Sequence, residues 1–202
     1  MVPVTRRRHM QVRYLTMLCV ACLANVPAGC ARQQPTIPLM DPAQTAAEIR
    51  KILPQLEKGH SDKLQLAWYI SWFRSVNSPI AHFSQSMARH EGALQKQLQA
   101  WAHRHGVSLA YHYGHGVAGQ AQKAMDHEQG NIVRSDSNAA FQRDFLVLMF
   151  TDYDWQEHLA AALIPYAKNH PQLERYLHAA VAYHKRGVKQ LRFLLSKYHY
   201  VR

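Results

Sequence analysis

Apolar residues recur at intervals of three and four along the chain, which is the pattern of amphipathic α-helices. The pattern covers residues 42–76, 79–105, 137–166 and 171–198, and no alternating β pattern occurs anywhere. Within the first stretch, we expect one helix to end at Gly59 and Ser61 to cap the next. The sequence therefore predicts an all-α protein, a ferritin-like up-down four-helix bundle built from two similar hairpins.

The breaks between these stretches carry residues that begin and end helices. Asp41-Pro42 and Asn77-Ser78-Pro79 each offer a capping side chain followed by a proline in the first helical turn. Gly106 is expected to stop the second helix. Residues 107–136 are rich in glycine, histidine and tyrosine, and we expect them to form a long crossover or lid between the second and third helices, with a short helix near 119–128.

A similar motif occurs in two of the predicted helices. Residues 88–94 read Ala-Arg-His-Glu-Gly-Ala-Leu, and residues 182–188 read Ala-Tyr-His-Lys-Arg-Gly-Val. His90 and His184 lie in line with the apolar residues of their helices. An unpaired polar group in a core is costly, so each histidine must be hydrogen-bonded, ligated or neutral. We expect both to face the interior.

The N-terminus has the organisation of a bacterial export signal. Four arginines precede an apolar segment, 14–28, that is too short to be a good membrane-spanning helix. Ala28-Gly29-Cys30 resembles a lipobox, which predicts that Cys30 becomes the lipidated first residue. Val26-Pro27-Ala28 also suits an ordinary signal peptidase, which would give a soluble periplasmic protein, and an uncleaved anchor is the third alternative.

This interpretation divides the chain into a signal peptide (1–29), a tether (30–41) and a helical domain (42–199). Ala31 after the cysteine favours the periplasmic side of the outer membrane for a lipidated form. The rest of the chain has no run of about 18 apolar residues, so we do not expect it to span a membrane.

The net charge and the cysteine content limit the partners and the stabilising bonds that we expect for this protein. Loss of the four arginines of the signal lowers the formal net charge from +11 to +7, and the remaining lysines and arginines are scattered. We expect no nucleic-acid partner; attraction to an anionic envelope surface fits this distribution better. All three cysteines lie at or before residue 30, so the helical domain depends on packing without disulfides.

With these residues in place, the chain resembles a bacterial family of predicted outer-membrane or periplasmic proteins, a domain of unknown function with a ferritin-like helical bundle. The resemblance covers roughly residues 43–198 and is strongest over 78–90, where a helix start and an apolar pair are followed by Met-x-x-His, with Gly-Val at 106–107 as the helix ends. It implies an envelope location and a helical bundle.

Two of the three family histidines are present, at His90 and His184, the latter followed by Leu191 seven residues later. In the third helix, Gln142 stands where the family has aspartate, Phe145 where it has tyrosine, and Tyr153 where it has histidine; Met149 is kept. A related exported family, suspected of copper handling, has a Met-x-x-His-His motif that is absent here.

The chemistry of the predicted interior favours a small site at most. A carboxylate-bridged di-iron centre needs a Glu-x-x-His motif on each of two helices, and the chain does not have two such motifs. Asp152 falls on the predicted stripe of its helix at about the depth of His90 and His184. Two imidazoles and a carboxylate can bind a divalent transition metal, or they can form a purely structural hydrogen-bonded network.

Four other histidines cluster around the glycine-rich segment: His103, His105, His112 and His115. They form either a weak metal-scavenging patch or an ordinary polar loop.

No motif in the sequence supports nucleophilic catalysis, and an enzyme is the least favoured class. We expect an exported, lipid-anchored binding or structural module of the bacterial envelope. The alternative is a histidine-based transition-metal-binding protein in envelope metal homeostasis or redox defence.

Overall fold

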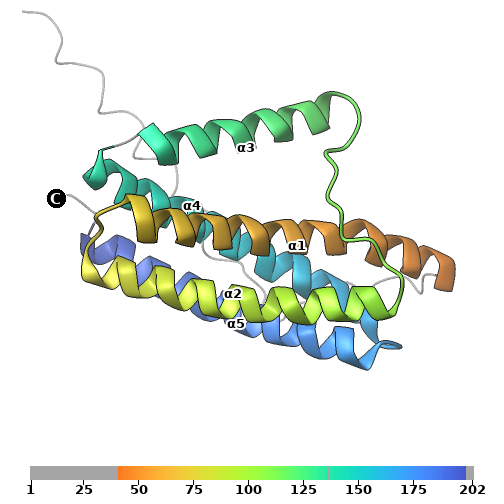
Figure 1. The fold of residues 1–202 in the computed structure, drawn as a ribbon. Helices are drawn as coiled ribbons and strands as arrows, with labels where there is room; N and C mark the ends of the chain where they lie inside the picture. The colour runs from red at the N-terminus through yellow and green to blue at the C-terminus, as the bar shows by residue number, and fades with distance from the viewer. Residues whose placement is uncertain (1–40, 136, 199–202) are drawn as a thin grey trace, which may run out of the picture. The chain divides into compact units, whose positions relative to one another are not determined.

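Five α-helices make up most of the described residues, 41–135 and 137–198, of the computed structural model (Figure 1). They are α1 (Pro42–Phe73), α2 (Ser78–Arg104), α3 (Val117–Ser135), α4 (Asn138–Leu163) and α5 (Pro171–Tyr198), with a 3₁₀ turn at Ile164–Ala167. No strand occurs in these residues, so the predicted all-α class is confirmed. The expected signal peptide, Cys30 and the tether up to residue 40 lie outside the described residues.

The predicted capping residues begin their helices. The carboxylate of Asp41 accepts a hydrogen bond from the backbone N–H of Gln44, and the Gln44 side chain returns to the Asp41 backbone, which completes a capping box. The Asn77 side chain accepts from the N–H of Ile80 at the start of α2. Gly106, with a φ of 63°, follows the end of α2. These local signals set the helix ends because they satisfy N–H and C=O groups that have no partner within the helix.

The expected helix break at Gly59 is wrong, because α1 runs through it without interruption. A Cβ atom at this position would lie 2.0 Å from the side-chain nitrogen of Gln156 on α4. The glycine therefore allows close approach of two helices and does not end one. The short helix expected near 119–128 is also longer than predicted, since α3 covers 19 residues.

Four long helices pack side by side, and α3 lies along one side of them, where it contacts α4 (Figure 1). The chain passes from α1 to α2 and from α4 to α5 by short connections, so the helices of each pair are antiparallel. The connection from α2 to α4 is long and contains α3, as the predicted crossover requires. Among the described helices, none combines the length and apolar character that a membrane crossing needs.

The interior has two apolar clusters along the length of the helices. One contains Leu53, Leu98, Leu163 and Leu177, and the other contains Phe83, Phe145 and Leu191. On α1, α2 and α5, a few buried polar residues stand between the residues of the two clusters. This polar layer is the candidate functional site.

Candidate functional site

Three helices contribute fully buried acidic and basic side chains to the polar layer. His60 and Lys63 come from α1, Glu91 from α2 and His184 from α5, and each has 0% exposed surface. Each continues the buried stripe of its own helix, as between Leu56 and Ala67 on α1 and between Met87 and Leu94 on α2. Helical periodicity therefore directs these side chains inward with their apolar neighbours.

Glu91 is the centre of the layer. Its Oε2 atom lies 2.5 Å from His60 Nδ1, and its Oε1 atom lies 3.3 Å from His184 Nε2 and 4.0 Å from Lys63 Nζ. The other nitrogen of His60, Nε2, lies 2.7 Å from the Tyr176 hydroxyl. The rings of His60 and His184 are stacked with their centroids 6.1 Å apart. The carboxylate thus contacts both imidazoles and a buried ammonium group.

Several polar atoms of this layer have no hydrogen-bond partner. They are Glu91 Oε1 and both ring nitrogens of His184, all enclosed by protein. The approach of His184 Nε2 to Glu91 Oε1 is close but is not aligned as a hydrogen bond. Most buried polar groups in proteins are paired, so unpaired atoms on a carboxylate and a facing imidazole need an explanation.

The pKa values describe a carboxylate that stays ionised and an imidazole that stays neutral. Burial alone would raise the pKa of Glu91, but the Lys63 charge and the contacts with His184 and His60 outweigh it, and the pKa falls below its usual range. Burial lowers the pKa of His184, and the Glu91 contact only partly opposes this. Burial also favours the neutral form of Lys63, but Asp152 and Glu91 prevail and its pKa is raised.

The layer and the residue paired to it hold more carboxylates than ammonium groups. Lys63 Nζ lies 2.6 Å from Asp152 Oδ2, whose side chain is 28% exposed. Two carboxylates, one of them partly exposed, thus face one ammonium group. A cation bound in this layer would therefore meet two carboxylates and a single ammonium group.

His60, Glu91 and His184 can act together as metal ligands. One ligand atom from each can be chosen so that all lie within 4.8 Å of one another. Two imidazoles and a carboxylate form a common ligand set for Zn²⁺ and for non-haem Fe²⁺. Within residues 41–135 and 137–198, no other group of three or more such side chains meets the same condition.

The structure does not bring together His90, His184 and Asp152, the three residues that the sequence analysis predicted as one site. His184 lies in the buried layer as expected. Asp152 reaches the layer only by its ion pair with Lys63, because the buried face of α4 carries Tyr153 and Gln156 instead. His90 is exposed, so its expected inward orientation is wrong.

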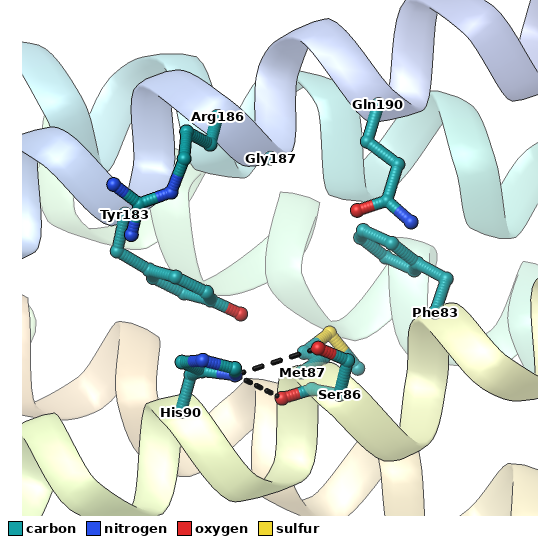
Figure 2. Close-up of a pocket in the computed structure, with 8 residues that line it drawn as sticks. All are labelled: Phe83, Ser86, Met87, His90, Tyr183, Arg186, Gly187 and Gln190. Atoms are coloured by element: carbon teal, nitrogen blue, oxygen red, sulfur yellow. Dashed lines mark hydrogen bonds between the residues drawn. The ribbon is translucent and has the colours of Figure 1, made fainter.

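His90 lies at the surface between α2 and α5. Its ring stacks on Tyr183 at a centroid distance of 4.9 Å, and its Nδ1 atom bonds the Ser86 carbonyl oxygen at 2.8 Å (Figure 2). Both residues line a cavity of about 180 Å³ with Arg186 and other side chains. The Tyr183 hydroxyl lies 2.7 Å from that of Tyr153, and the Tyr183 ring also packs against His184, so Tyr183 separates His90 from the buried layer.

All four histidines around the glycine-rich segment are exposed: His103, His105, His112 and His115. His105 is held by its own helix end, where its ring stacks on Trp101 at 4.4 Å and its Nδ1 atom bonds the Trp101 carbonyl oxygen at 2.8 Å. A metal-scavenging role for the four histidines therefore stays a prediction.

The sequence interpretation missed His60, Glu91 and Lys63. The signal for them was the spacing of polar residues that continue an apolar stripe, such as Leu56, His60 and Lys63 on α1. The expected break at Gly59 hid this continuity on α1. On α2, His90 and Glu91 follow Met87 by three and four residues, so periodicity alone permits either to face inward.

No protein-family model matches the chain, and no curated protein matches it. Among solved structures, it is similar to a DUF305 fragment from Deinococcus radiodurans, with a TM-score of 0.59 and 16% sequence identity. The match covers 74% of this chain and 96% of that chain. At this identity the likeness concerns the fold alone: the chain shares a helical fold with a bacterial domain of unknown function.

Proposed function

We propose that this protein binds one divalent transition-metal ion in the interior of its helical bundle, through His60, Glu91 and His184. The observation that carries the proposal is the convergence of three ligand atoms to within 4.8 Å of one another in a fully buried setting. The unpaired atoms of Glu91 and His184 support it, because a metal ion supplies the partner that they lack.

The surroundings of His60 also suit a metal ligand. In a neutral ring, Nδ1–H donates to Glu91 Oε2, and the Tyr176 hydroxyl donates to Nε2. A tyrosine hydroxyl can donate or accept, so rotation of this hydroxyl allows Nε2–H to donate to Tyr176 instead. The Nδ1 lone pair is then free for a metal ion, and Tyr176 fixes the tautomer as an outer-sphere partner.

A metal-free network is the competing function, and a specific observation favours it. Both nitrogens of His60 already have hydrogen-bond partners within the protein, Glu91 and Tyr176. Under this alternative, the buried residues act in stability and specificity only. The two candidates predict opposite results in a metal titration.

The test is a titration of untagged, metal-free protein with Zn²⁺ and Co²⁺, followed by calorimetry and by the visible absorption of Co²⁺. The proposal predicts one equivalent bound by the wild type. It predicts loss of that site in His184→Ala and Glu91→Gln. His90→Ala is the matched control, because it removes an exposed histidine adjacent to Glu91 on the same helix, and it should bind like the wild type.

If the wild type binds no metal, the metal-free network is the better account. Binding that is lost in His90→Ala and kept in His184→Ala would place the metal at the surface and would also overturn the proposal.

We further propose that the four long helices form a ferritin-like up-down bundle that is exported and held at the bacterial envelope by a lipid on Cys30. The antiparallel helix pairs support the first part, and the lipobox-like residues 28–30 support the second. Cys30→Ala should abolish acyl labelling and release the protein from the membrane fraction. Wild-type protein recovered wholly in the soluble fraction would contradict the lipid anchor.

A further inference from the structure

A cavity of about 1060 Å³ lies between α3 and the faces of α1 and α4. Figure 1 shows α3 lying along one side of the bundle, on the side of α1 and α4. The cavity lining includes aromatic residues such as Trp68, Trp155 and Tyr111. It also includes residues that adjoin the buried layer: Gly59, Lys63, Asp152 and Gln156.

Lys63 stands between this cavity and the three metal-ligand candidates. Its side chain has no exposed surface, although it belongs to the cavity lining. Its ammonium group lies 2.6 Å from Asp152 Oδ2 and 4.0 Å from Glu91 Oε1, and it donates to the Gly59 carbonyl oxygen at 3.1 Å. Asp152 is partly exposed, so the ion pair has one member toward solvent and one toward the site.

The opposite side of the bundle offers a poorer route. The small cavity in Figure 2 is lined by Tyr183 and His90 but by none of the three ligand candidates. Tyr183 closes that direction through its hydrogen bond to Tyr153, which is fully buried beside His184. Of the two described cavities, the one beneath α3 is lined by a residue, Lys63, whose side chain forms an ion pair with Glu91.

We propose that a divalent metal ion enters from the cavity beneath α3, and that the Lys63–Asp152 ion pair is the gate through which it reaches Glu91. This inference rests on the proposed metal-binding function. Asp152 attracts the cation at the inner end of the cavity, whereas the Lys63 ammonium repels it and occupies the path to the carboxylate. The four-carbon stem of lysine lets the ammonium move aside without a change in the backbone.

The gate makes a prediction that a purely structural ion pair does not make. Loss of either member breaks the same ion pair, so a structural role should change metal association in one direction for both variants. The gate requires the Lys63 and Asp152 variants to change the association rate in opposite directions. Lys63→Met should speed association about tenfold or more, because fixed charges near a binding path change association rates by ~10–10³-fold. Asp152→Asn should slow association severalfold.

The experiment is stopped-flow mixing of the metal-free, untagged protein with Co²⁺, followed by visible absorption. Lys63→Arg keeps the charge and should associate at about the wild-type rate. Lys96→Met is the control, because Lys96 is an exposed lysine of α2 that does not line this cavity. It should stay within about twofold of the wild type. Circular dichroism checks the fold of each variant, and Lys63→Gln replaces Lys63→Met if the latter does not fold.

Equal or slower association in the neutral Lys63 variants would overturn the gate. A shift of the Lys63 and Asp152 variants in the same direction would overturn it as well. If these results come with stoichiometric metal that depends on Glu91 and His184, the gate fails and the proposed function stands. If the wild type and Glu91→Gln bind no metal alike, the proposed function fails and the gate fails with it.

Discussion

Replacement of Glu91 by glutamine tests whether the buried layer is held together by the charge of this residue. The change keeps the size of the side chain and removes its negative charge. The short hydrogen bond from His60, at 2.5 Å, then loses its ionised acceptor, and Lys63 keeps only Asp152 as its counter-ion. The metal-free protein should therefore become less stable.

The expected loss follows from the contacts of Glu91. Hydrogen bonds to charged groups contribute about 1.5–3 kcal/mol, and loss of one partner of a buried ion pair costs ~3–5 kcal/mol. The lower part of this range applies, because the Lys63–Asp152 contact of 2.6 Å remains. We expect the free energy of unfolding to fall by about 2–4 kcal/mol. In a domain of this size, that corresponds to a decrease in Tm of roughly 5–15 °C.

The assay is urea and thermal unfolding followed by circular dichroism, with a chelator present so that metal binding does not contribute. Glu128→Gln, on the exposed surface of α3, makes the same chemical change without burial and should alter stability by less than about 0.5 kcal/mol. If Glu91→Gln is as stable as that control, the buried charge is not what holds the layer together, and the reasoning is refuted.

Three further results are expected. Tyr176→Phe should weaken metal binding about 10–100-fold, because it removes the outer-sphere partner of a ligand histidine. Tyr69→Phe, whose ring packs on Phe73 and Phe141 and on none of the three ligands, should leave the affinity unchanged in the same calorimetric titration. Because the pKa of Glu91 is lowered in the folded state, the stabilisation by its carboxylate is complete above the usual pKa of 4.5 and is lost as the pH falls below it. The free energy of unfolding should therefore depend less on pH in Glu91→Gln than in the wild type. The same pH dependence in both proteins would contradict the pKa shift. Gly187→Ala should destabilise the fold by about 1–3 kcal/mol in urea unfolding, because the new Cβ atom would lie 2.2 Å from the buried ring of Tyr153 on α4. Gly92→Ala is the control: its Cβ atom would lie 3.7 Å from Leu64, and the change should be neutral or slightly stabilising.

The helix ends were predictable because their causes are local. Asp41 and Asn77 cap the helices that follow them, and each capping contact is made within three residues of the cap. Gly59 was misinterpreted because its cause is tertiary. The close approach of Gln156 from α4, nearly a hundred residues later, explains the glycine and is absent from any local pattern.

The site was predicted only in part because helical periodicity fixes a face and not a single residue. His184 lies alone among apolar neighbours on α5, and its burial followed from that position. On α2, the adjacent His90 and Glu91 compete for the interior, and a carboxylate is the more costly residue to bury. Glu91 is buried because α1 supplies His60 and Lys63 and α5 supplies His184, and no pattern within α2 contains those partners.

The most direct test of the metal site is the anomalous difference map of a crystal of the untagged protein grown with Co²⁺ or Zn²⁺. The account predicts one strong peak in the interior, at about 2.0–2.2 Å from a nitrogen of His60, a nitrogen of His184 and an oxygen of Glu91. An interior without a peak, or a peak only at exposed histidines such as His90 or His105, would contradict it.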